Sequence, residues 1–179
     1  MNQLFLNAII ADNHMNALSD LISAQGIDVN LPIYHGITPL LLAAANNSMN
    51  SITVLLNAGA DPDLICEIGA HTPLFVAAML GRKEMVIKLL EAGAGVNVFS
   101  GQYTPIEAAA FRGHVDIVHI LLAAGAGIVD PQNNHDNTPF DLLQSAGHLA
   151  SVQGHDEISR ELYSHHFRFQ LQLCGPSVC

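Results

Sequence analysis

Apolar residues in the middle of the chain recur at helical spacing, in two short stretches separated by a glycine. Leu74, Ala77 and Ala78 lie three and four positions apart, which places them on one face of a helix. Gly81 then interrupts the pattern and suits a turn. A second apolar stripe consists of Met85, Val86, Leu89 and Leu90. Gly93 follows it at a natural position for a left-handed helix end, so the segment predicts two short antiparallel helices.

The same two-helix pattern returns once more along the chain. Its apolar positions are Ile106, Ala109, Ala110, Ile117, Val118, Leu121 and Leu122, and Gly113 takes the turn position. Short helices with one apolar stripe cannot bury that stripe alone, so neighbouring pairs must stack on one another.

Two sequence marks give this repeat a period. The dipeptide Thr-Pro begins at Thr38, Thr72, Thr104 and Thr138, which are nearly evenly spaced. Ala-Gly-Ala has its glycine at Gly59, Gly93 and Gly125, always at the same distance from the preceding threonine of that series. The distance from each glycine to the next threonine is not constant. A module of fixed length therefore alternates with a surface connector, and each module starts with a Thr cap and a Pro at the first helical position.

These motifs resemble those of the ankyrin-repeat family. The matching segments are TPLFVAA, RGHVDIVHILLAAGA and Asp28-Val29-Asn30. The resemblance implies an all-α solenoid of about five stacked helix-turn-helix units with hairpin-like connectors. The family's histidine after Thr-Pro-Leu is replaced here, and Asn46-Asn47 stands where a turn glycine is expected. The replacing residues are Leu41, Phe75, Glu107 and Asp141.

The repeat marks also divide the chain. We expect an ankyrin-repeat domain over residues 1–166, followed by a non-repeat tail over 167–179. Within the domain we expect a capping repeat over 1–30, internal repeats over 31–133 and a C-terminal repeat over 134–166.

Composition narrows the range of partners. Half of the 179 residues are hydrophobic, 12% are charged, and the formal net charge is −10. An acidic chain is a poor ligand for nucleic acid or for an anionic membrane surface, so neither is expected as a partner. No apolar stretch approaches the roughly 20 residues of a membrane helix, and no signal peptide is indicated. The three cysteines are odd in number, which does not suggest a disulfide framework and favours a reducing compartment. We expect a cytoplasmic monomer; secretion into a host cell stays open.

Chemistry-bearing residues show no catalytic or metal pattern. The ten histidines form no His-x-x-x-His pair, and the cysteines form no Cys-x-x-Cys pair. His165, His166 and Cys174 are the best metal candidates, but adjacent histidines point to different sides of a helix. Cys66 near His71 is a weak candidate for a nucleophile. The sequence therefore predicts no enzyme, no cofactor and no metal site.

Binding residues follow from the resemblance. Ankyrin-repeat proteins hold partners with their connector tips and the exposed face of the first helix of each unit. Carried over by position, that surface comprises Tyr34, His35, Ile37, Asn46, His71, Met79, Leu80, Gln102, Tyr103, Phe111 and Arg112. Packing between repeats is the alternative for Met79 and Phe111. The scarcity of lysine on this side favours a basic or mixed partner.

The function expected from the sequence is a protein–protein interaction module. The alternative is a targeting or inhibitory subunit that regulates an enzyme, including a bacterial effector that acts in a host cell.

Overall fold

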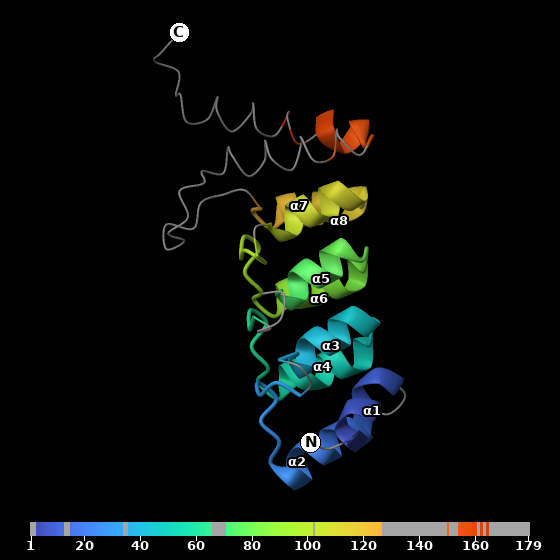
Figure 1. The fold of residues 1–179 in the computed structure, drawn as a ribbon, viewed down its shortest axis with the longest axis vertical. Helices are drawn as coiled ribbons and strands as arrows, with labels where there is room; N and C mark the ends of the chain where they lie inside the picture. Colours follow the sequence, from blue (N-terminus) through green and yellow to red (C-terminus); the bar gives the residue numbers. More distant parts are fainter. Residues whose placement is uncertain are drawn as a thin grey trace.

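Stacked helix pairs form the described part of the molecule (Figure 1). The computed structural model describes residues 3–12, 15–33, 36–65, 71–101, 103–126, 150, 154–160, 162 and 164. Its labelled helices are α1 (Gln3–Ala11), α2 (Met15–Gln25), α3 (Pro39–Asn46), α4 (Met49–Asn57), α5 (Pro73–Met79), α6 (Lys83–Glu91), α7 (Pro105–Arg112) and α8 (Val115–Ala123). Residues 156–160 are also helical and lie beyond α7 and α8 at the far end of the stack (Figure 1).

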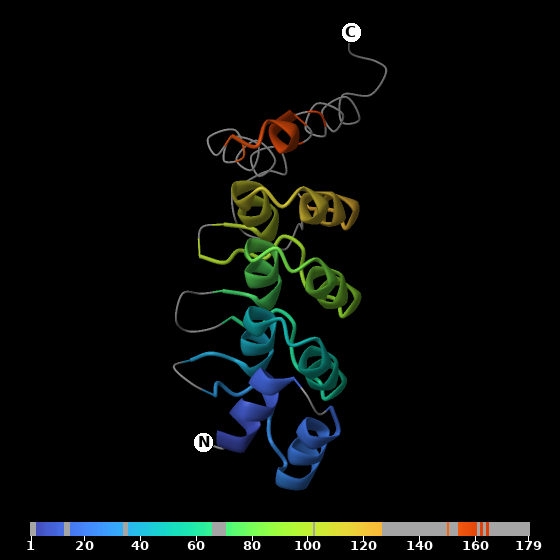
Figure 2. The same cartoon turned by 90° about the vertical axis from the view of Figure 1, so that its right-hand side faces the viewer.

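Each pair contributes one helix to each of two columns. The first helices α1, α3, α5 and α7 form one column, and the second helices α2, α4, α6 and α8 form the other (Figure 2). The connectors project on the side of the first column that faces away from the second helices (Figure 2). This arrangement confirms the predicted solenoid of stacked helix-turn-helix units.

The connectors close as tight turns, in keeping with the hairpin-like form expected of them. The N–H of Ser100 donates to the carbonyl of Tyr103 at 2.8 Å, and the N–H of Tyr103 donates back to the carbonyl of Ser100 at 3.3 Å. In an earlier connector the N–H of Ile33 donates to the carbonyl of Ile37 at 2.8 Å. These turns lead the chain to the start of the next first helix.

Local signals in the sequence set both ends of the first helices. The hydroxyls of Thr38 and Thr72 each accept a hydrogen bond from the N–H three residues later, at 3.2 Å in both cases. The turn after each first helix has a residue with positive φ, which favours glycine or asparagine. Those residues are Asp12 (50°), Asn47 (61°), Gly81 (73°) and Gly113 (78°). Asn47 therefore takes the turn position that the sequence assigned to it.

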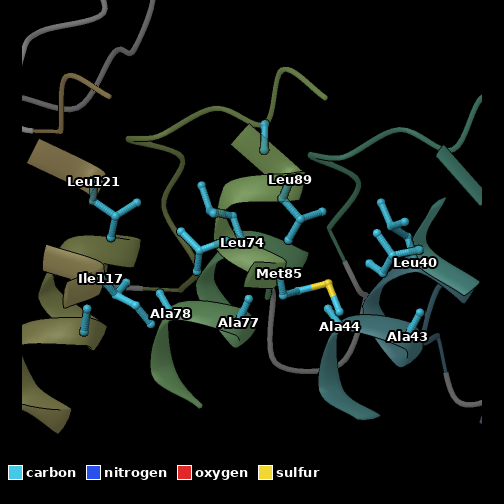
Figure 3. Packing of buried hydrophobic residues seen from close by; sticks show 14 of the residues in the cluster. Leu40, Ala43, Ala44, Leu74, Ala77, Ala78, Met85, Leu89, Ile117 and Leu121 are labelled. Atoms are coloured by element: carbon cyan, nitrogen blue, oxygen red, sulfur yellow. The ribbon is translucent and has the colours of Figure 1, made fainter. Parts of the chain in front are cut away.

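The main core lies between the two columns of helices (Figure 3). Leu74, Ala77 and Ala78 are fully buried, and the equivalent Leu40, Ala43 and Ala44 lie beside them in the neighbouring pair (Figure 3). The small alanines let α3, α5 and α7 approach one another, while the second helices fill the remaining space with Met85, Leu89, Ile117 and Leu121. Leu90 and Leu122, predicted in the same stripes, are only partly buried and pack against the edge of the core.

Two predicted segments extend outside the described residues. These are the tail at 167–179 and most of the C-terminal repeat at 134–166. From that repeat, Ala150, Ile158 and Leu162 are buried in the same core as the preceding pairs.

Candidate functional site

The first helices bury a second apolar cluster, separate from the main core. Leu41, Phe75, Val76 and Ala108 form it, and the partly buried Ile37 and Met79 pack against it. The cluster joins α3, α5 and α7, and neither α3 nor α5 contains a charged residue. One face of the first column is therefore apolar along α3 and α5, and α7 adds Ala108 to it.

A hollow opens in this face between α5 and α7. It has a volume of about 200 Å³ and is lined by Phe75, Met79, Tyr103, Glu107, Ala108, Phe111 and Arg112; we call it the α5–α7 hollow. Tyr103 and Phe111 are large hydrophobic side chains, yet 48% and 40% of their surfaces stay exposed. Small-molecule sites enclose roughly 300–1,000 Å³. The α5–α7 hollow is therefore smaller than such sites and has the size for a protruding side chain.

A buried carboxylate lies at the base of helix α7 in this hollow. Glu107 is only 4% exposed. Its Oε2 accepts hydrogen bonds from the backbone N–H of Thr104 at 2.7 Å and from the Thr104 hydroxyl at 2.8 Å. The bond from the Thr104 N–H to the Glu107 carboxylate is that of a capping box, and the two bonds together hold the Glu107 side chain at the start of α7. Glu107 stands at the position of the missing family histidine in this unit.

Arg112 provides positive charge on the same hollow. Its side chain is exposed, and no ion pair joins it to a carboxylate within the described residues. The ion pairs found there lie on the second helices instead. Lys83 Nζ is 2.9 Å from Asp116 Oδ2, and Lys88 Nζ is 3.9 Å from Glu91 Oε2.

His71 packs on Phe75, one of the residues that line the hollow. Its ring stacks on Phe75 with a centroid distance of 5.0 Å and an interplanar angle of 11°. Its Nδ1 atom is buried without a hydrogen-bond partner among the described residues. The neighbouring Thr72 N–H donates to the hydroxyl of Ser100 at 2.9 Å, which ties this part of the chain to the next connector. Phe75 is thus held between the stacked imidazole and the second apolar cluster.

The structure brings only part of the predicted binding residues together. Met79, Tyr103, Phe111 and Arg112 line the α5–α7 hollow. Ile37 belongs to the second cluster, Asn46 donates its amide to the Leu42 carbonyl at 2.9 Å, and Leu80 is exposed where α5 ends. His71 stacks on Phe75, and the other three predicted residues, Tyr34, His35 and Gln102, lie outside the described residues.

Sequence reasoning missed three lining residues: Phe75, Glu107 and Ala108. Phe75 and Glu107 had been noted only as replacements of the family's histidine. That replacement was the signal, because a residue at the third helical position of α5 or α7 faces the hollow. The inter-repeat packing alternative holds in part for Met79, which is half-buried, whereas Phe111 keeps its exposed surface.

The other features of the described residues offer fewer groups that could bind or react with a ligand. A second hollow of about 380 Å³ between α2 and α4 is lined by Asn16, Ser19, Ile22, Ser23, Val54, Asn57 and Ala58, without a charged or aromatic group. In the part of the chain that is described, no three His, Cys, Asp or Glu side chains gather as metal ligands. No helix in that part is long and apolar enough to cross a membrane.

Comparison with known families agrees with the geometry. A family model described as ankyrin repeats in three copies matches residues 63–133, and a single ankyrin-repeat model matches residues 35–67. Together the two matches cover more than half of the chain. No curated protein matches the sequence.

Proposed function

The chain belongs to the ankyrin-repeat family, whose members are in general protein–protein interaction modules, and we propose that it binds a protein partner through the connector ends and helices α3, α5 and α7. The observation that supports this choice of surface is the α5–α7 hollow. It combines two exposed aromatic rings with a guanidinium that no described carboxylate neutralises. Tyr and Arg are the residue types that dominate the energetic centres of interfaces.

The packing of this face favours binding without rearrangement. Phe75 is fixed by its stack on His71, and Glu107 is fixed by its hydrogen bonds to Thr104. A partner that meets side chains already in place loses less conformational entropy on association. Phe111 and Tyr103 supply apolar area, and Arg112 supplies donors for a carboxylate or a carbonyl of the partner.

A paired substitution tests the proposal. We expect the Phe111→Ala, Arg112→Ala variant to fold normally and to lose at least about 2 kcal/mol of binding free energy, which is roughly 30-fold in affinity. Affinity purification with the wild-type chain and with the variant, followed by mass spectrometry, identifies partners whose capture depends on these residues. Titration calorimetry with a captured partner then measures the loss.

Two controls make the result interpretable. Circular dichroism must show the same helix content in both proteins, because a lost fold would place Phe111 in the core. Lys83→Ala changes an exposed cation on the second column and should leave capture unchanged. A folded double variant that retains every partner would contradict the proposed surface.

A further inference from the structure

The α5–α7 hollow contains an acidic group among aromatic ones, which points to the kind of side chain that enters it. We propose that the hollow takes the side chain of a lysine or arginine of the partner, and that Glu107 meets its positive charge. The inference rests on the proposed function and names the chemistry of its central contact.

The shape and lining of the hollow fit a long side chain with a cationic end. Phe75, Tyr103 and Phe111 present aromatic surface on one cavity of about 200 Å³. Aromatic faces attract ammonium and guanidinium groups, and the effect grows as water is excluded. The methylene stem of lysine or arginine packs on apolar surface while its charged end reaches a polar group.

Glu107 is the polar group that such a side chain reaches. It is almost fully buried, and both of its hydrogen bonds end on Oε2. Within the described residues no ion pair joins Glu107 to a cation. The Glu107 carboxylate lies in the same lining as the aromatic side chains, so a cation from the partner is attracted both by the negative charge and by the aromatic faces.

The charges around the hollow set the character of the rest of the segment. The formal net charge of −10 attracts basic partners over a distance. Arg112 is exposed on the lining of the hollow and repels a second cation placed next to the first. The fitting segment therefore has one basic residue for the hollow and an acidic or polar residue beside it for Arg112.

Glu107→Gln isolates the charge of this carboxylate. Glutamine also completes a capping box with threonine, so the N–H of Thr104 keeps its acceptor and α7 keeps its start. The shape of the side chain is nearly unchanged, while the negative charge is removed and one acceptor oxygen becomes an NH2 group. Arg112→Gln is the matched variant, because it removes the opposite charge from the same hollow.

Peptide selection supplies the probe. A phage-displayed library of random twelve-residue peptides is selected on the full chain, and enriched peptides are measured by fluorescence polarisation. We expect lysine or arginine to be enriched at one position of the selected peptides. We expect Glu107→Gln to weaken such a peptide about tenfold, the difference between a charged and a neutral hydrogen bond. In the Arg112→Gln variant, replacing the basic residue of the peptide should weaken binding as much as it does with the wild-type chain.

A double-mutant cycle completes the test. Replacing the basic residue of the peptide by norleucine should weaken binding to the wild-type chain about tenfold, and should have little further effect on Glu107→Gln. Equal effects of norleucine on both proteins, or selected peptides with an apolar residue at this position, would overturn the inference while the proposed function stands. Peptides whose binding is indifferent to Phe111→Ala would overturn the proposed function itself. If Glu107→Gln fails to fold, the comparison of lysine with norleucine on the wild-type chain decides.

Discussion

Single residues at one equivalent position tie each unit to the next. Asn30 uses both ends of its amide: its Nδ2 donates to the Gly59 carbonyl at 3.1 Å, and its Oδ1 accepts from the Asp61 N–H at 2.8 Å. Asn97 likewise donates to the Gly125 carbonyl, at 3.5 Å. Asp63 stands at the same position of the unit between them and can only accept, with the Gly95 N–H at 2.9 and 3.0 Å from its two oxygens. The tie made by Asp63 is therefore incomplete.

The negative charge of Asp63 reduces the stability that this contact between units provides. Burial raises the pKa of Asp63 above its ordinary value of 3.8; the hydrogen bond from Gly95 acts against this, and the charge of Asp61 adds to it. Because the folded state holds the proton more tightly than the unfolded state, the contribution of Asp63 to stability falls as pH rises from below 3.8 through the raised pKa.

Asp63→Asn should therefore stabilise the protein at pH 7. The amide has no charge to desolvate and can donate to a carbonyl of the next unit as Asn30 does, so we expect a gain of about 0.5–1.5 kcal/mol. Urea denaturation at pH 7 measures the gain. At about pH 3 the gain should shrink, because Asp63 is then largely protonated in both states. A variant that is less stable than wild type at pH 7 would refute this view of the site.

At the scale of elements, the turn between the two helices of a unit also contacts the next unit. Gly81 has a φ of 73°, and a Cβ built on it would lie 2.7 Å from the His114 ring. His114 precedes α8 and its Nε2 lies 3.3 Å from the Met79 carbonyl. One unit later, a Cβ built on Gly113 would likewise lie 2.5 Å from the His155 ring. The turn glycine of one unit and the histidine of the next unit therefore set the packing of adjacent helix pairs.

Gly93 offers a matched comparison for Gly81. It also has positive φ, 88°, but a Cβ there would meet nothing within 4 Å. We expect Gly93→Ala to cost about 1–2 kcal/mol of stability from backbone strain alone. Gly81→Ala should cost about 1–3 kcal/mol more, because it also crowds the His114 ring. Thermal or urea unfolding of the two variants measures the difference, and equal losses would show that the ring moves aside freely.

At the scale of the whole molecule, stability depends on contacts between successive units. Helices α1, α3 and α5 each pack on the next helix of the first column. In the first unit, Asp12 reaches across to the start of α4, where its Oδ1 accepts from the Ser51 N–H at 2.8 Å and from the Ser51 hydroxyl at 2.9 Å. The Asp12 carboxylate thus acts as an N-terminal cap for a helix of the next unit, since Ser48 makes no side-chain cap there.

Asp12→Ala should loosen the first unit from the stack. The loss of a cap costs about 0.5–2 kcal/mol, and in a linear array it falls on the interface concerned. Hydrogen exchange should therefore become faster in α1 and α2, while amides of α7 and α8 keep their protection. Equal acceleration in all units would mean that the stack unfolds as one cooperative block.

The sequence by itself determined the units and their order. Helix period, Thr caps, turn residues and Leu-Ala-Ala positions are local signals, and each acts close to the residue concerned. They predicted correctly the helix pairs, the buried stripes and the special role of Asn47. The resemblance to the ankyrin-repeat family, carried over by position, put Met79, Tyr103, Phe111 and Arg112 on one expected surface, and these four residues line the same hollow.

Only the tertiary structure decided how neighbouring units share that face. Phe75 and Glu107 belong to successive units, and their meeting in one hollow depends on how α5 packs against α7. Whether Phe111 is buried or exposed also depends on the size of the side chains across that contact. The sequence pattern predicts which face of a helix a residue occupies. The depth of a hollow between two helices depends on how two units pack, and this packing is a property of the tertiary structure.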